Sequence, residues 1–240
     1  ERRAAARATG AARSGGRGDD TGASRELPRG HGQAVVESFF TGPAGLAAMS
    51  RQAVREYIAA NREDLFSLVA DLVERPSVSG NEGDVQRFVA DELSSLGLEP
   101  DVWEPDVEAY RDHPGYFDTN TYQTVGYEGR PNVAATASGR GDGPSLALSG
   151  HVDVVDVERE EWTHDPWTAT REGDRLYGRG AADMKSGVAA NLFAYRALRE
   201  CDVALEGDLI LQSTIDEEAG GTGGVLSALE RGYRPDAAVI

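Results

Sequence analysis

The chain has 240 residues, of which 40% are hydrophobic, and this is enough for a packed core in one large domain or two modest ones. The formal net charge of −17 argues against nucleic acid as a partner because phosphates would be repelled. There is no apolar run of about 18 residues that could span a membrane, and the single cysteine, Cys201, excludes an internal disulfide and favours a cytoplasmic location.

The charge is unevenly divided among residue types. Acidic residues number 41 and basic residues 24, and Lys185 is the only lysine. This composition resembles the surface of proteins from salt-accumulating halophiles, in which concentrated salt screens the repulsion between acidic groups. A halophilic origin is therefore a hypothesis from composition.

Residues 1–48 differ from the rest of the chain. They carry seven arginines and five acidic residues, and they have neither apolar periodicity nor the hydrophobic region of a signal peptide. Helical periodicity begins just after Met49. We interpret residues 1–48 as a disordered arm or a translated leader and Met49 as the start; a flexible extension with a local role is the alternative.

Two helices are expected next. A first set of apolar residues recurs at helical spacing until Pro76: Val54, Ile58, Leu65, Leu68, Val69 and Leu72. The second helix is expected to begin at an Asn81 cap and to end at Gly97. The polar and aromatic stretch that follows, up to about Pro131, predicts a short strand and loops.

Four apolar runs then have the length of strands, namely residues 132–138, 145–150, 208–215 and 236–240. Helices are expected over about 186–199 and over 222–231, the second closed by Gly232. Alternation of strands and helices indicates an α/β layered sheet.

Three clusters near the predicted strand ends carry candidate chemistry. In the first, His151 and Asp153 are two positions apart, so they point the same way in an extended chain. Asp153 could accept the second N–H of the His151 imidazole, as carboxylates do beside metal-binding histidines. An ordinary polar pair is the alternative.

The second cluster is the glycine-rich stretch GRGAADMKSG, residues 178–187. Asp183 occupies the third glycine position of a dinucleotide-binding loop, so that interpretation fails. What remains is a tight turn that brings Asp183 to the start of a helix, where it could equally serve as a cap.

The third cluster places Asp216, Glu217 and Glu218 directly after an apolar strand, followed by glycines that favour a sharp reversal. A solvated turn in an acidic protein is the alternative. Taken together, the clusters bring one imidazole and several carboxylates to strand ends, where ligands gather in open α/β sheets. Nitrogen and oxygen donors without thiolate suit Zn, Mn or Co, and this many carboxylates favour two ions. No G-x-S-x-G motif is present, so serine catalysis has little support.

The segments SGHVDVVDV, WTHDPWTATREGDRLYGRGAADMKSG and ILQSTIDEEAGGTGG, in this order and spacing, resemble the M20 metallopeptidase family. This family includes acetylornithine deacetylases, succinyl-diaminopimelate desuccinylases, aminoacylases and glutamate carboxypeptidases. The resemblance implies an α/β three-layer sandwich with a mostly parallel mixed sheet, of the zinc-exopeptidase type. It also implies that residues 49–240 are the N-terminal portion of the catalytic domain, without the lid and dimerisation domain.

The resemblance assigns roles to the matching residues. His151 would bind one metal ion, Asp183 would bridge two ions, and Glu218 would bind the second. Glu217 would be the general base, and Asp153 would orient His151. The ions would be two divalent metals, zinc first with cobalt or manganese as alternatives, and the family's further acidic and histidine ligands would lie beyond residue 240.

The function implied is a cytoplasmic deacylase that hydrolyses the amide bond of N-acyl amino acids or related compounds and forms a homodimer when full length. A carboxypeptidase or dipeptidase with the same site is the first alternative, and a non-catalytic homologue that binds a ligand or partner is the second. Lys185 offers a compact ammonium that could stabilise the turn or a neighbouring carboxylate, unless it is a lysine retained by chance.

Overall fold

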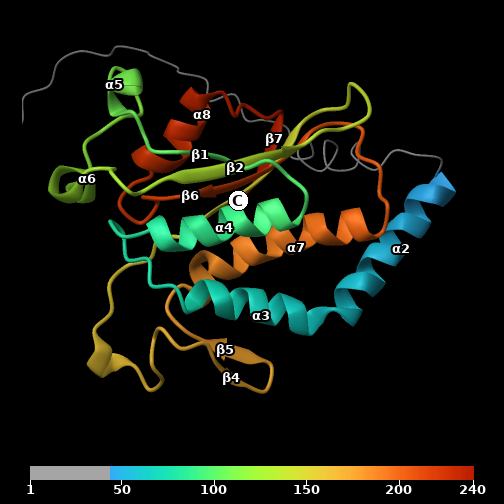
Figure 1. Cartoon of the computed structure of the whole chain (residues 1–240), viewed down its shortest axis with the longest axis horizontal. Helices are drawn as coiled ribbons and strands as arrows, with labels where there is room; N and C mark the ends of the chain where they lie inside the picture. The colour runs from blue at the N-terminus through green and yellow to red at the C-terminus, as the bar shows by residue number, and fades with distance from the viewer. Residues whose placement is uncertain (1–43) are drawn as a thin grey trace, which may run out of the picture.

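The computed structural model describes residues 44–240, with side chains described from Met49 onward. In this part of the chain a central sheet lies between helices on both faces, which confirms the predicted α/β sandwich (Figure 1). Residues 1–43 of the predicted arm lie outside the described residues. The first described helix, α2, begins at Ala44, five residues before Met49, so the helix starts earlier than its apolar periodicity indicates.

The central sheet has the strand order β1-β2-β6-β3-β7. Its strands are β1 (Asp101–Trp103), β2 (Asn132–Ala137), β3 (Leu146–His151), β6 (Leu209–Thr214) and β7 (Ala237–Val239). β3 is parallel to both β6 and β7, whereas β2 is antiparallel to its two neighbours. Among these strands β2 therefore runs against the other four, as expected for a mostly parallel mixed sheet.

One face of the sheet is covered by long helices and the other by short ones (Figure 1). The long helices are α2 (Ala44–Ala60), α3 (Arg62–Val73), α4 (Gly83–Ser95) and α7 (Ser186–Glu200). Of these, α4 and α7 pack against the sheet, and α2 and α3 pack against α7. On the opposite side lie α5 (Val107–Tyr110) and α8 (Ser227–Arg231). Helix α6 (Asn120–Val125) and a hairpin of β4 (Thr170–Glu172) and β5 (Arg175–Tyr177) complete the described elements, with single turns at Arg159–Glu161, Ala181–Lys185 and Thr222–Leu226.

The core lies between the long helices and the sheet. Every residue of β6 is buried: its first three residues are apolar, and Gln212, Ser213 and Thr214 are buried polar residues. Val152, Leu192, Leu211 and Ile215 belong to the same apolar cluster. This packing fixes the carboxyl ends of β3 and β6 beside the start of α7. Among the described helices none is both long enough and apolar enough to cross a bilayer.

Three local predictions were wrong. The expected single first helix is divided at Asn61, whose φ of −109° and ψ of 28° depart from helical values and whose side-chain amide donates to the carbonyl of Tyr57. Asn81 does not cap α4; the cap residue is Glu82, and its carboxylate pairs with Arg130 instead of a helix N–H. The stretch before residue 131 also contains two short helices in addition to β1, and Thr119 caps the second of them.

Candidate metal centre

The site lies where two parallel strands end. His151 is the last residue of β3 and is level with Thr214, the last residue of β6. The acidic turn, which we define as residues 216–221, follows β6 after one buried residue, Ile215. Because parallel strands end at the same edge of a sheet, His151 faces the acidic turn.

A second turn delivers Asp183 to the same place. The Asp183 turn, residues 178–185, precedes α7 and contains a left-handed glycine, Gly180, with φ of 76°. A Cβ at Gly180 would lie 2.5 Å from the side chain of Val154, so the turn approaches the segment after β3 more closely than another residue would allow. The peptide bond between Asp183 and Met184 is cis. The side chain of Asp183 is 78% exposed and faces His151.

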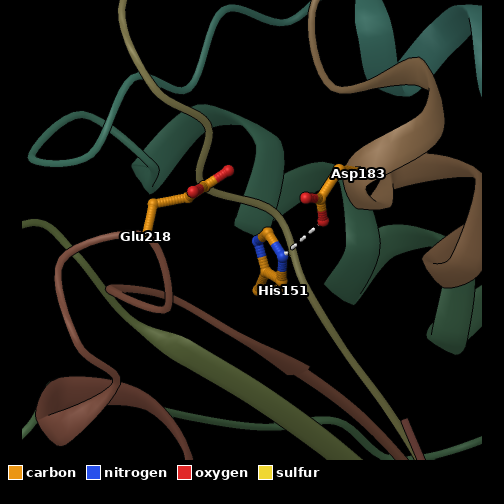
Figure 2. Close-up of side chains that lie close together, drawn as sticks. All are labelled: His151, Asp183 and Glu218. Carbon is orange, nitrogen blue, oxygen red and sulfur yellow. Dashed lines mark hydrogen bonds and ion pairs between the residues drawn. The ribbon is translucent and has the colours of Figure 1, made fainter.

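The predicted metal ligands meet in space. His151 Nε2 lies 3.2 Å from Asp183 Oδ1, and one ligand atom each of His151, Asp183 and Glu218 lie within 4.8 Å of one another (Figure 2). The imidazole is buried and both carboxylates are exposed. Glu217 Oε2 is 3.5 Å from His151 Nε2, so the second carboxylate of the acidic turn also reaches this place.

Asp153 is buried beneath these ligands and contacts both His151 and the acidic turn. His151 Nδ1 lies 2.9 Å from the Asp153 main-chain carbonyl oxygen and 3.4 Å from Oδ1, so the carbonyl is the nearer acceptor. The Asp153 carboxylate accepts hydrogen bonds from Ser79 Oγ at 2.9 Å and from the backbone N–H groups of Glu217 and Glu218, each at 3.1 Å. Asp153 therefore joins the histidine to the acidic turn, a contact that the sequence did not predict.

The electrostatics of the cluster favour a cation. Burial disfavours a charged imidazole at His151, but hydrogen bonding to Asp153 and the charges of Asp153 and Glu217 outweigh it and raise the His151 pKa to about 9. Burial together with the charge of Asp183 raises the pKa of Glu218. A divalent cation would relieve the repulsion among these acids, and the set of one imidazole and carboxylates fits Zn, Mn or Co.

Lys185 anchors the Asp183 turn. Its side chain is fully buried, and Nζ donates to the carbonyl oxygens of Leu72 at 2.9 Å and Arg75 at 2.8 Å, at the carboxyl end of α3. Burial and the charge of Arg75 lower the Lys185 pKa to about 7. Lys185 therefore stabilises the turn through backbone carbonyls; the predicted alternative of a neighbouring carboxylate was wrong.

The acidic turn is also held through Asp216. Asp216 is buried, and its carboxylate contacts the side chains of Tyr127 and Arg130. The sequence predicted no role for these two residues or for Ser79. These contacts join residues far apart in the chain, so no local spacing indicated them.

Comparison with known proteins gives the class to which this fold and this cluster belong. Residues 147–240 match the sequence model of Peptidase family M20/M25/M40, and the chain belongs to this family. It is 36% identical over 194 residues to N-formyl-4-amino-5-aminomethyl-2-methylpyrimidine deformylase of Bacillus subtilis, over 78% of this chain and 40% of that protein. It is 32% identical over 180 residues to succinyl-diaminopimelate desuccinylase of Leptothrix cholodnii, over 73% of this chain and 42% of that protein.

Solved structures share the fold. Human carnosine dipeptidase 1 superposes with a TM-score of 0.58 at 22% identity, over 72% of this chain and 36% of that chain. An M20 family metallo-carboxypeptidase from Sulfolobus solfataricus gives 0.57 at 24% identity, over 74% and 36%. The chain thus spans about two fifths of the length of the curated relatives it matches.

Proposed function

We propose that the protein containing this chain is a metal-dependent amidohydrolase that removes the acyl group from an N-acyl amino acid or a related compound. The observation that carries this proposal is the convergence of His151, Asp183 and Glu218 within 4.8 Å, with Glu217 beside them. Such a set supplies both metal ligands and one carboxylate that is free for proton transfer.

The metal-binding residues would be His151 for one ion, Glu218 for the other and Asp183 between them. Zinc is the first candidate, with cobalt and manganese as alternatives, because the donors are nitrogen and oxygen. Two bound divalent ions would polarise the amide carbonyl and lower the pKa of an attacking water.

Glu217 is the proposed general base. Its side chain is 56% exposed, so water and substrate can reach it, and its backbone N–H is held 3.1 Å from Asp153 Oδ1. Oε2 would accept the proton of the attacking water and return it to the leaving amine, which needs that proton to depart. Asp153 would keep His151 and the acidic turn in register during this transfer.

Two alternatives differ in substrate or class. A dipeptidase or carboxypeptidase would use the same residues, and its support is the fold shared with carnosine dipeptidase 1 and the Sulfolobus metallo-carboxypeptidase at 22% and 24% identity. The deformylase and the desuccinylase are more similar, at 36% and 32%, and this favours deacylation. A non-catalytic binding protein would keep the fold without turnover.

The test is hydrolysis by the full-length gene product. The protein loaded with Zn, Co or Mn would be assayed on N-formyl, N-acetyl and N-succinyl amino acids and on dipeptides, with Glu217→Gln as the inactive control. We expect turnover of at least one N-acyl compound that exceeds turnover of the dipeptides. Turnover of dipeptides alone would favour the peptidase, and no turnover of any compound would favour the binding protein.

A further inference from the structure

The two carboxylates of the acidic turn are positioned through the main chain that carries them. Glu217 and Glu218 each donate a backbone N–H to Asp153, so their side chains extend from a fixed backbone. The turn opens at Asp216, which has φ of 66°. This left-handed conformation is unfavourable for residues other than glycine, although aspartate adopts it more readily than most. Something must therefore hold Asp216 in place.

The carboxylate of Asp216 is fully buried and accepts three hydrogen bonds. Tyr127 donates its hydroxyl to Oδ2 at 2.9 Å, Arg130 donates Nη2 to Oδ1 at 3.2 Å, and Gly223 donates its backbone N–H to Oδ2 at 3.3 Å. The donors come from the loop before β2 and from the segment beyond the acidic turn. The side chain is thus fixed on both oxygens, and a fixed side chain limits the backbone conformations open to Asp216.

Arg130 links this carboxylate to the rest of the fold. Its Nε and Nη2 form two 2.7 Å hydrogen bonds to the carboxylate of Glu82 at the start of α4, and Nη1 donates to the carbonyl of Gly126 at 2.8 Å. Arg130 and Glu82 are both buried. A guanidinium held in this bidentate geometry has little conformational freedom. Arg130 therefore fixes Asp216 relative to the start of α4.

We propose that Tyr127, Arg130 and Asp216 are positioning residues that hold the acidic turn in the conformation that presents Glu218 to a metal ion and Glu217 to the attacking water. This inference rests on the proposed function, because it concerns the same site. Substitution of residues that orient metal ligands without binding the metal typically lowers metal affinity about 10- to 100-fold. Tyr127 is the residue to test, because it can lose its hydroxyl while the ring stacked on Tyr122 stays.

The chain contains a matched control cluster of the same three residue types. Arg231 donates Nε and Nη2 to Asp101 at 2.9 and 2.7 Å, and Tyr233 donates its hydroxyl to Asp101 at 3.0 Å. The Tyr233 ring is stacked on Trp103, with centroids 5.5 Å apart. Asp101 lies on the edge strand β1, which β2 and β6 separate from β3 and its His151. Tyr233→Phe therefore removes a tyrosine–aspartate hydrogen bond that has no role at the metal centre.

The experiment compares Tyr127→Phe, Tyr233→Phe and wild type in the full-length protein. Zinc affinity would be measured by isothermal titration, thermal stability on the metal-free protein, and kcat and KM on the best N-acyl substrate. We expect Tyr127→Phe to weaken zinc binding about 10-fold and to lower kcat more than it raises KM. Tyr233→Phe should leave zinc affinity and kcat unchanged. Asp216→Asn, which puts an amide N–H where Oδ2 accepts from Tyr127, should weaken zinc binding at least as much.

The outcomes separate this inference from the proposed function. Equal zinc affinity in wild type and both tyrosine variants, with only thermal stability changed, would overturn the positioning role. Wild-type protein that binds zinc but hydrolyses nothing would overturn the proposed function, while the comparison of zinc affinities would still decide whether the cluster positions the acidic turn.

Discussion

The two turns that carry the exposed carboxylates are anchored by different buried cations. The Asp183 turn is tied by Lys185, whose ammonium bonds two backbone carbonyls at the end of α3. The acidic turn is tied by Arg130, whose guanidinium bonds the carboxylates of Glu82 and Asp216. Both cations are almost completely buried. In each case an exposed acidic side chain lies on a turn that a buried cationic side chain holds to the rest of the fold.

The two anchors make contacts of different geometry. An ammonium is compact and directs its donors to separate single acceptors, such as the last carbonyls of a helix, where the helix dipole also favours a positive charge. A guanidinium presents a planar fork that matches a carboxylate. The anchor of the Asp183 turn needs the first geometry and the anchor of the acidic turn needs the second.

The largest effect is expected for Glu217, the proposed general base on the acidic turn. In the full-length protein, Glu217→Gln should lower kcat about 10²- to 10⁴-fold because the proposed general base is lost. Metal content, measured by plasma mass spectrometry, should stay that of wild type because Glu217 is not a proposed ligand. A variant that loses its metal along with its turnover would show that Glu217 is a ligand and that the base lies elsewhere.

On the other turn, Asp183→Ala should remove the metal itself. A carboxylate that binds both ions, as we propose for Asp183, should matter more than residues that only orient the ligands, so we expect zinc affinity to fall by more than about 100-fold. Asp174→Ala is the matched control, because Asp174 is an equally exposed acid that pairs with Arg62 away from the site. Similar zinc affinity in the two variants by isothermal titration would contradict the role of Asp183.

The next effect concerns the anchor of the Asp183 turn. Lys185→Met keeps the apolar stem but removes the ammonium donor of the Leu72 and Arg75 carbonyls, so the free energy of unfolding should fall by about 1–3 kcal/mol. Lys185→Arg should cost a similar amount, because a larger planar group must fit a fully buried position. Urea unfolding of the metal-free proteins measures both changes. If Lys185→Arg keeps wild-type stability and activity, arginine serves equally well at this position and the lysine is one retained by chance.

The smallest effect is expected at Asp153, which joins His151 to the acidic turn. Ser79→Ala removes one hydrogen bond to the Asp153 carboxylate, which keeps its two backbone donors, so unfolding should become easier by about 1 kcal/mol. Ser94→Ala, on an exposed part of α4, is the control for loss of a serine hydroxyl. Equal, near-zero changes in urea unfolding would indicate that Ser79 adds nothing to the hold on Asp153.

The sequence predicted the parts of the fold that depend on neighbouring residues. The apolar runs located β2, β3, β6 and β7, and the helix expected over about 186–199 is α7 (Ser186–Glu200). The cap of α4 could not be predicted in this way. Asn81 is a favourable cap by local rules, but Glu82 is recruited by Arg130, 48 residues along the chain. Long-range pairing outweighed local preference at this position.

The same distinction holds at the site. His151, Asp183 and Glu218 could be named from their types, their spacing and the family resemblance, and they do meet. The residues that support them could not be named from the sequence, because the contacts of Tyr127 and Arg130 with Asp216 join residues 89 and 86 positions apart. A pattern along the chain carries no information on such pairs until the sheet brings β2 beside β6.

Anomalous diffraction from crystals of the full-length protein with zinc tests the assignment of ligand and base most directly. We predict zinc peaks about 2.0–2.2 Å from His151 Nε2 and from carboxylate oxygens of Asp183 and Glu218, the usual distances for these ligands. The Glu217 carboxylate should be uncoordinated beside them. A peak bound by Glu217 in place of Glu218, or no peak at His151, would contradict the proposed division between metal ligands and general base.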